Sequence, residues 1–348
     1  GLFDGSSVDS EEWDAEDIGE GGTFYLRDVI SGGSFLFVDM RETESVLVEN
    51  PSLNLLSITH SYSSSVVIDN IADWNLVGLP LNVEDNYYLS VFPTAVENSG
   101  YEFDAEGYGL VTNMSLGSGY WLRFENEGET VVEGQPVNNL TISLMEGWNL
   151  ISGISTPVHI DDIVDPDELI IPQTLFGFSE NGYGSPEALI SGKGYWLRSN
   201  GNGEIILSSG IRSTKGKQEI VDRMADANTI TFNGNTLYFG VSVPDEEKLS
   251  YSLPPKPPVG AFDVRFTNDM NYAESLGEIE VNGVDDLLKI EYKIKSEAGE
   301  HMKWELISDS GAKYDLDVQG EITITDNSTT FTLAKKAEVP AVFALSQN

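Results

Sequence analysis

The middle of this chain contains the same sequence box twice. The first box opens with Trp74-Asn75-Leu76 and closes with Gly-x-Gly-Tyr-Trp-Leu-Arg at residues 117–123. The second box opens with Trp148-Asn149-Leu150 and closes with the same pattern at residues 192–198. Self-similarity at a fixed period is typical of one structural unit used more than once, so the box constrains architecture before any other feature does.

The spacing of the boxes defines the repeated unit. Trp148 follows Trp74 by 74 residues, and Tyr195 follows Tyr120 by 75, so a single residue was inserted between the two landmarks. Each unit opens with an alternating apolar run, which is typical of a β-strand with one buried face. We therefore predict two tandem β modules, which we name repeat 1 (residues 65–134) and repeat 2 (residues 138–210).

The closing motif predicts a turn followed by a strand. Glycines two residues apart before a bulky aromatic pair favour a tight turn or bulge. Neighbouring strand residues point to opposite faces, so one of Tyr120 and Trp121 is expected in the core and the other on the opposite surface. An exposed aromatic pair would offer a platform for sugars. We instead expect core packing for Trp74, Trp148 and the buried member of each pair.

The rest of the chain also predicts strands. Residues 1–22 are an acidic segment, and residues 23–64 contain short apolar runs between turns, as strands do. Thr23-Phe24-Tyr25-Leu26-Arg27 echoes the closing box, which suggests a remnant of an earlier module. Residues 211–227 mix basic and acidic side chains and predict either a linker or the one short helix.

The C-terminal region, residues 228–348, carries short alternating strands at about ten-residue spacing, the pattern of a β-sandwich. Asn233-Gly234 between two such runs is the strongest hairpin signal in the chain. The proline cluster at residues 254–258 cannot donate to a strand ladder and predicts an extended connector or edge. The predicted fold class is all-β: tandem modules, then a β-sandwich, with little helix.

The chain is strongly acidic, with 57 acidic and 19 basic residues and a net charge of −38. Such a field repels nucleic acid and anionic membranes and attracts cations, so we expect no nucleic-acid partner. No apolar run approaches the roughly 18 residues of a membrane helix, so we expect no membrane insertion. The charge fits either a solvated surface adapted to salt or carboxylates that converge on Ca²⁺.

Two acidic clusters are candidates for metal binding. One lies between Asp9 and Asp17, and the other contains Asp161, Asp165, Asp167 and Glu168. Neither matches the twelve-residue EF-hand loop, but the second offers ligands for an irregular Ca²⁺ site. The alternative interpretation is an acidic turn in solvent. Calcium is the one cofactor that the sequence suggests.

Catalysis has little support in the sequence. Cysteine is absent, which excludes disulfides, thiolate catalysis and sulfur-ligated metals. The three histidines, His60, His159 and His301, stand in no metal or triad motif. No nucleophile elbow, phosphate loop or zinc-protease motif is present. We predict that the protein is not an enzyme and assign no catalytic residue.

The end of the chain resembles a known class of exported proteins. Residues 342–348 read Val-Phe-Ala-Leu-Ser-Gln-Asn, which is similar to the stretch that leads into a type IX secretion sorting domain in large secreted proteins of the Bacteroidetes. The two boxes and the proline-rich approach to residues 260–266 also resemble modules found ahead of that domain. The resemblance covers about residues 65–348, implies export and display at the bacterial cell surface, and transfers no catalytic residue.

These observations predict a non-enzymatic extracellular structural or adhesive protein. We expect it to self-associate into a homopolymer, as the subunit of a fibre or surface layer that assembles through β-strand contacts. In this hypothesis the acidic segment 1–22 pairs with a sheet edge of a neighbouring subunit, and cations or salt offset the mutual repulsion. The alternative is a carbohydrate-binding accessory region of a larger secreted hydrolase, with glycans as partners.

Overall fold

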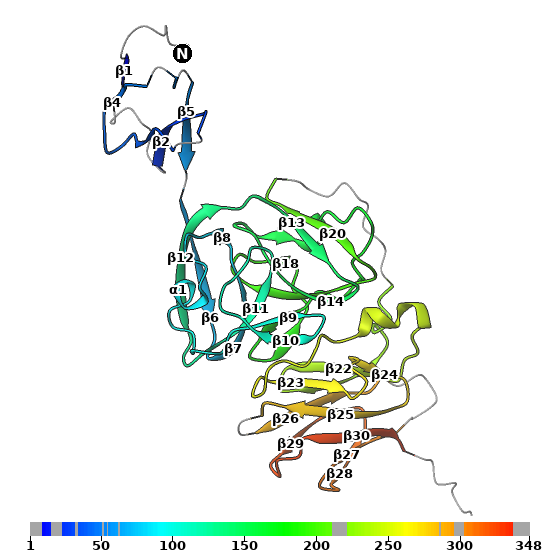
Figure 1. Ribbon diagram of the computed structural model, residues 1–348. Helices are drawn as coiled ribbons and strands as arrows, with labels where there is room; N and C mark the ends of the chain where they lie inside the picture. Colours follow the sequence, from blue (N-terminus) through cyan, green and yellow to red (C-terminus); the bar gives the residue numbers. More distant parts are fainter. Residues whose placement is uncertain are drawn as a thin grey trace, which may run out of the picture.

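The computed structural model of the chain describes residues 9–14, 23–31, 34–50, 52–53, 55–61, 63–210, 221–284, 287–295 and 303–336. Within them the elements are strands, most of them paired antiparallel, apart from α1 (Tyr88–Val91), η1 (Ile160–Asp162) and η2 (Asp245–Tyr251). The all-β prediction is confirmed. Figure 1 shows an N-terminal sheet, a central body and a C-terminal body in sequence order. No helix among the described residues is long and apolar enough to cross a membrane.

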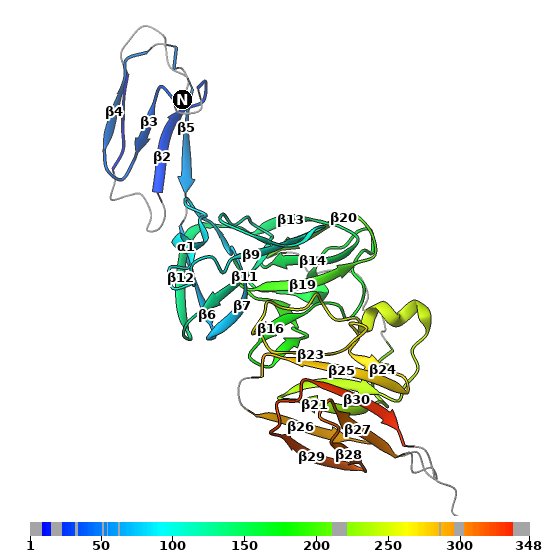
Figure 2. The same cartoon turned by 60° about the horizontal axis from the view of Figure 1, so that its bottom comes forward.

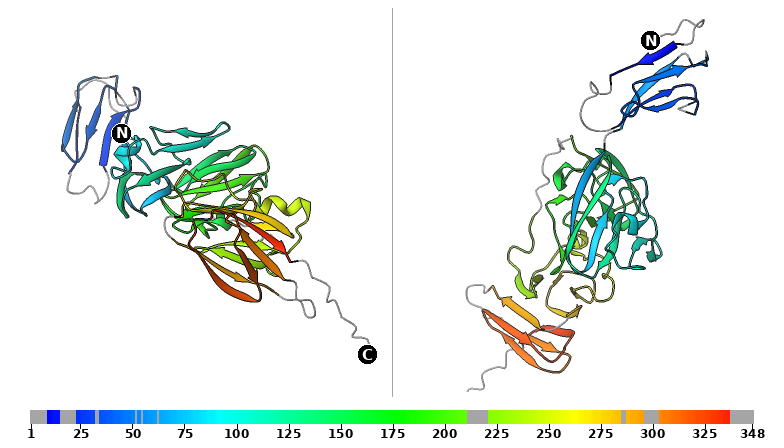
Figure 3. Two further views of the ribbon diagram at one scale, coloured as in Figure 1. Left: turned by 90° about the horizontal axis from the view of Figure 1, so that it is seen from below. Right: turned by 90° about the vertical axis from the view of Figure 1, so that its left-hand side faces the viewer.

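The first five strands form two small sheets, which we call together the N-terminal sheet. It consists of β1 (Asp9–Glu12), β2 (Thr23–Asp28), β3 (Phe37–Asp39), β4 (Ser45–Val48) and β5 (Leu56–Ser61). Strands β3, β2 and β5 form one sheet, and β1 pairs antiparallel with β4. Figures 2 and 3 show these strands standing apart from the central body. Of the acidic segment, the described part therefore forms a strand that pairs within its own chain.

The two repeats share the pairing of their outer strands and of their box strands. Repeat 1 comprises β6 (Ser64–Asn70), β7 (Asp73–Gly78), β8 (Leu81–Asn82), α1, β9 (Tyr101–Asp104), β10 (Gly107–Leu110), β11 (Gly119–Phe124) and β12 (Gly128–Pro136). Repeat 2 comprises β13 (Asn139–Leu144), β14 (Gly147–Ser152), β15 (Val158–His159), η1, β16 (Gly177–Ser179), β17 (Gly182–Gly184), β18 (Ala188–Leu189), β19 (Gly194–Ser199) and β20 (Gly203–Ser208). The first strand pairs with the last in each repeat, β6 with β12 and β13 with β20. The strands of the two boxes pair with each other, β7 with β11 and β14 with β19. The repeats differ in their short strands, since β8 pairs with β12 whereas β15 pairs with β18.

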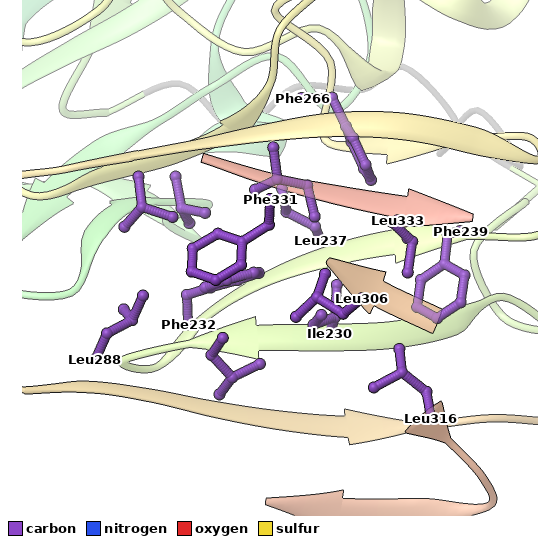
Figure 4. Close-up of a cluster of buried hydrophobic side chains, with 14 of the residues drawn as sticks. Ile230, Phe232, Leu237, Phe239, Phe266, Leu288, Leu306, Leu316, Phe331 and Leu333 are labelled. Carbon is purple, nitrogen blue, oxygen red and sulfur yellow. The ribbon is translucent and has the colours of Figure 1, made fainter. Parts of the chain in front are cut away.

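The C-terminal body contains two five-stranded sheets. Its strands are β21 (Asn228–Phe232), β22 (Asn235–Phe239), β23 (Asp263–Phe266), β24 (Tyr272–Ala273), β25 (Leu276–Asn282), β26 (Leu288–Lys293), β27 (Trp304–Ser308), β28 (Lys313–Leu316), β29 (Gln319–Ile324) and β30 (Thr330–Lys335). The sheet orders are β24-β22-β21-β26-β29 and β23-β25-β30-β27-β28. Buried side chains from both sheets, such as Phe232 and Phe331, meet in one core (Figure 4).

Turn chemistry explains the hairpin that opens this body. Asn233 and Gly234 connect β21 to β22, and both have positive φ, 42° and 91°. Two positive φ values in a two-residue loop define the hairpin turn for which Asn-Gly is the preferred pair. The predicted hairpin is confirmed. The sequence left a linker or a short helix open for residues 211–227. Residues 221–227 form turns without a helix, and residues 211–220 lie outside the described part.

Candidate functional site: a shared aromatic cluster and a proline strap

The aromatic pair of each box is buried on both faces of its strand. Tyr120 and Trp121 are 1% and 0% exposed, and Tyr195 and Trp196 are 4% and 0% exposed. The tyrosines lie in the cores of their own repeats, and the tryptophans lie in a second cluster to which both repeats contribute. The prediction that one member of each pair faces a surface is wrong. The physical reason is that the opposite face of each strand is covered by the other repeat.

The shared cluster has approximate two-fold symmetry. Trp121 packs edge-on against Phe178 at 4.7 Å between ring centroids, and Trp196 packs against Phe103 at 4.8 Å. Trp121 lies 6.3 Å from Tyr183, and Trp196 lies 6.3 Å from Tyr108. Each box tryptophan therefore inserts among the aromatic residues of the other repeat. Such edge-to-face pairs contribute roughly 0.5–1.5 kcal/mol each beyond the area they bury.

Symmetric hydrogen bonds between the repeats accompany the cluster. The amide of Gly78 donates to the carbonyl of Gly192, and the amide of Ser152 donates to the carbonyl of Gly117, both at 3.0 Å. Gly117 and Gly192 have φ values of +83° and +82°, where a side chain is strained. The first glycine of each motif is therefore a turn residue, as predicted, and its carbonyl also joins the repeats.

The second glycine of each motif permits close approach. A Cβ added at Gly119 would lie 2.5 Å from the carbonyl oxygen of Ile151, and one added at Gly194 would lie 2.8 Å from that of Val77. Both contacts are shorter than carbon and oxygen tolerate, so only glycine fits there. The sequence analysis identified these glycines but not their close contact with the other repeat, because the contacting backbone is distant in the sequence.

The proline-rich segment crosses the shared cluster. We call residues 254–259 the proline strap; it connects η2 to β23. The hydroxyl of Tyr183 donates to the carbonyl of Pro255 at 2.8 Å, and the hydroxyl of Tyr108 donates to that of Lys256 at 3.0 Å. The indole N–H of Trp74 donates to the carbonyl of Val259 at 3.1 Å. Both repeats therefore hold the strap through side-chain donors.

A buried arginine holds the strap from the C-terminal body. Arg265 is fully buried, and its guanidinium binds both carboxylate oxygens of Asp263 at 2.7 and 2.8 Å and the carbonyl of Pro254 at 2.8 Å. Burial alone would lower the pKa of Arg265, but hydrogen bonds to Asp263 and Asp269 outweigh burial and raise it. Burial also raises the pKa of Tyr183 well above 10, so its hydroxyl stays a donor.

The predicted metal residues lie in a different place, in η1 and on the loop that follows it. Both carboxylate oxygens of Asp165 accept backbone amides, from Leu169 and Ile170, at 2.9 Å each. Asp161 lies in η1 next to His159, whose Nδ1 accepts its amide. All four predicted ligands, including Asp167 and Glu168, are described, and among the described residues no three acidic or imidazole side chains are grouped to hold an ion. Calcium binding here stays a prediction.

Sequence reasoning missed the tyrosines and the strap as partners. The equal spacing of Tyr108 and Tyr183 between the repeats was visible, but nothing in the sequence placed residues 254–259 against them. Residues 342–348, which carry part of the resemblance to exported proteins, lie outside the described residues. Comparison with protein-family models, with curated proteins and with solved structures found no match for this chain.

Proposed function

We propose that the chain is a non-enzymatic structural subunit outside a bacterial cell, which self-associates into a fibre or layer through its N-terminal sheet. The observation that carries this proposal is the apolar surface of that sheet. Seven large apolar side chains between residues 29 and 58 are exposed: Val29, Ile30, Phe35, Phe37, Leu47, Leu55 and Ile58. A sheet becomes stable by burying at least one face against another layer.

The strand register places these side chains on both faces of the sheet. Leu26 pairs with Ile58, and its neighbour Arg27 pairs with Phe37, so Ile58 and Phe37 point to opposite sides. Ile58 is 62% exposed and Phe37 is 58% exposed. Among the described residues, no buried apolar cluster includes a member of this sheet. Only Leu26, Met40, Val48 and Leu53 are buried apolar residues in this region of the described chain, so a second subunit would cover the exposed ones.

The edges of the sheet support assembly through strands. In the order β3-β2-β5, the outer edges of β3 and β5 have no strand partner within the described residues. Unpaired strand edges are templates for a further strand from another chain. The net charge of −38 opposes association, so assembly should require salt or divalent cations that screen this repulsion.

The duplicated boxes support a structural role more than a binding role. A carbohydrate site in the repeats would need exposed aromatic faces, whereas Trp121 and Trp196 are fully buried. The duplicated residues pack the repeats against each other and against the strap. The proposal also includes export and display at the cell surface, which the sequence resemblance implies.

The test compares matched surface substitutions in the full chain. Phe37→Ser with Ile58→Ser removes one exposed apolar side chain from each face of the N-terminal sheet. Leu110→Ser with Val131→Ser removes two residues of similar exposure, 65% and 58%, from repeat 1. Light scattering and negative-stain microscopy across salt and calcium concentrations measure assembly. We expect assembly by the wild type and by the repeat 1 variant, and its loss in the N-terminal variant. A wild type that stays monomeric in every condition, or equal assembly of all three, refutes the proposal.

A further inference from the structure

The two tyrosines that hold the strap are equivalent residues of the two repeats. Tyr183 follows Tyr108 by 75 residues, the spacing of the closing boxes. Their hydroxyls donate to the carbonyls of Pro255 and Lys256, which are consecutive in the chain. A symmetric pair of donors therefore meets two adjacent acceptors of one segment.

The strap has the chemistry that such a pair of donors recognises. Its prolines fix φ near −65° and lack an N–H. The segment belongs to no strand; it bends at Pro255 and Pro258, and the amide of Ala261 donates to the carbonyl of Pro258 at 3.1 Å in a turn. Aromatic-lined surfaces bind proline-rich segments because little conformational entropy is lost on binding. The side chain of Lys256 is exposed and pairs with Glu280, so the tyrosines read backbone and not a particular side chain.

Apolar residues anchor both ends of the strap. Leu253 and Ala261 are buried in the shared aromatic cluster, on either side of the proline-rich stretch. Pro254 is also buried, whereas the later prolines are half-buried and Lys256 and Val259 are exposed. The strap thus lies across the surface of the central body as a bound ligand does, with one side in contact and one side open.

We infer that Trp74, Tyr108 and Tyr183 form a binding site for proline-rich peptides, which the chain's own strap fills in cis. The three donors belong to the central body, whereas the strap belongs to the C-terminal body. The recognised groups are the backbone carbonyls of Pro255, Lys256 and Val259, with apolar anchors at each end. A proline-rich segment of another polypeptide fits the same donors once the strap is displaced. This inference does not depend on the proposed assembly.

The experiment weakens binding of the strap by substitution and adds a separate peptide with the sequence of the strap. Pro255→Gly, Pro257→Gly and Pro258→Gly in the full chain remove the stiffening while leaving Pro254, which Arg265 holds, unchanged. A fluorescent peptide with the sequence of residues 253–261 is titrated, and its anisotropy is measured. We expect saturable binding to this variant and at least tenfold weaker binding to the wild type, whose own strap has a high effective concentration.

Two controls connect the binding to the named groups. Adding Tyr108→Phe and Tyr183→Phe to the strap variant deletes the two hydroxyl donors, together with the acceptor that Tyr108 offers to the indole N–H of Trp121 at 3.3 Å. We expect at least a tenfold loss of peptide affinity. A peptide with alanine at all four proline positions should bind at least tenfold more weakly. Circular dichroism establishes that each variant is folded, and if the triple variant unfolds, Pro258→Gly alone takes its place. No saturable binding by the folded strap variant, or affinity unchanged by either control, overturns the inference.

Discussion

Substitution of the second glycine of each closing motif tests how the repeats are joined. In Gly119→Ala the new methyl group would lie 2.5 Å from the carbonyl oxygen of Ile151, and in Gly194→Ala it would lie 2.8 Å from that of Val77. Carbon and oxygen approach in β-structure to about 3.3 Å, so the repeats must separate locally by roughly 0.5–0.8 Å. Both variants should therefore loosen the aromatic cluster that the repeats share.

The expected magnitude follows from two opposing effects. Forcing an extra methyl group into a packed interface costs about 1–3 kcal/mol, and a gap of 0.5–1 Å forfeits about a quarter to a half of the dispersion energy across it. Alanine in a strand is favoured over glycine by only about 0.5–1 kcal/mol. The clash outweighs the propensity, so Gly119→Ala and Gly194→Ala should each lower the stability of the central body.

A matched control isolates the clash. A Cβ added at Gly184, on β17, meets nothing within 4 Å, so Gly184→Ala should keep only the favourable propensity and raise stability slightly. Thermal unfolding followed by tryptophan fluorescence is a suitable assay, because four of the six tryptophans lie in the shared cluster. One kcal/mol corresponds to roughly 2–4 °C for a unit of this size.

The double variant sharpens the test. Both substitutions push apart the same interface, so Gly119→Ala with Gly194→Ala should destabilise by less than the sum of the single effects. If the two single variants instead match Gly184→Ala and raise the melting temperature, the close approach of the repeats is wrong as the reason for these glycines.

Three further predictions concern charged groups. Asp263→Asn leaves the buried guanidinium of Arg265 with a weaker partner and should cost about 3–5 kcal/mol in chemical denaturation. Burial raises the pKa of Asp28, but hydrogen bonds from Ser31 and from nearby amides prevail and lower it to about 2. Because the folded pKa lies below the unfolded value of about 4, the stabilisation by Asp28 is complete above pH 4 and is lost as the pH falls toward 2. Faster hydrogen exchange of the Leu36 amide at low pH should detect this loss. Asp165→Ala should lower the melting temperature equally in calcium and in chelator, since the carboxylate binds amides; a loss confined to calcium would favour the metal site.

The sequence predicted what depends on local pattern. Strands β2, β3, β4 and β5 lie within residues 23–64, where short apolar runs predicted strands. The turn at Asn233-Gly234 follows from the φ values that these two residues adopt easily. The edge strand β28 is hard to predict, because Lys313–Leu316 alternates over only 4 residues. Local pattern fails where an element is short or where its partner is distant in sequence.

The burial of the aromatic pair could not be read from one strand. Alternation places Tyr120 and Trp121 on opposite faces, but it does not say what covers each face. The second glycine of the motif indicates that the opposite face is covered. Gly119 does not have a positive φ, so no turn requires a glycine there. A glycine without a turn is a signal that another backbone approaches closely.

The strap also explains why equivalent residues of the repeats differ. A single strap has no two-fold symmetry of its own, so equivalent positions of the two repeats meet different neighbours. Trp74 donates to the strap and stands beside the Asp73–Arg123 ion pair, whereas Trp148 has the guanidinium of Arg198 over its ring at 5.5 Å. The counterpart of Asp73 in repeat 2 is a glycine, which leaves Arg198 to stack on the indole. The sequence differences between the repeats at these positions therefore follow from the binding of one asymmetric strap to a two-fold symmetric site.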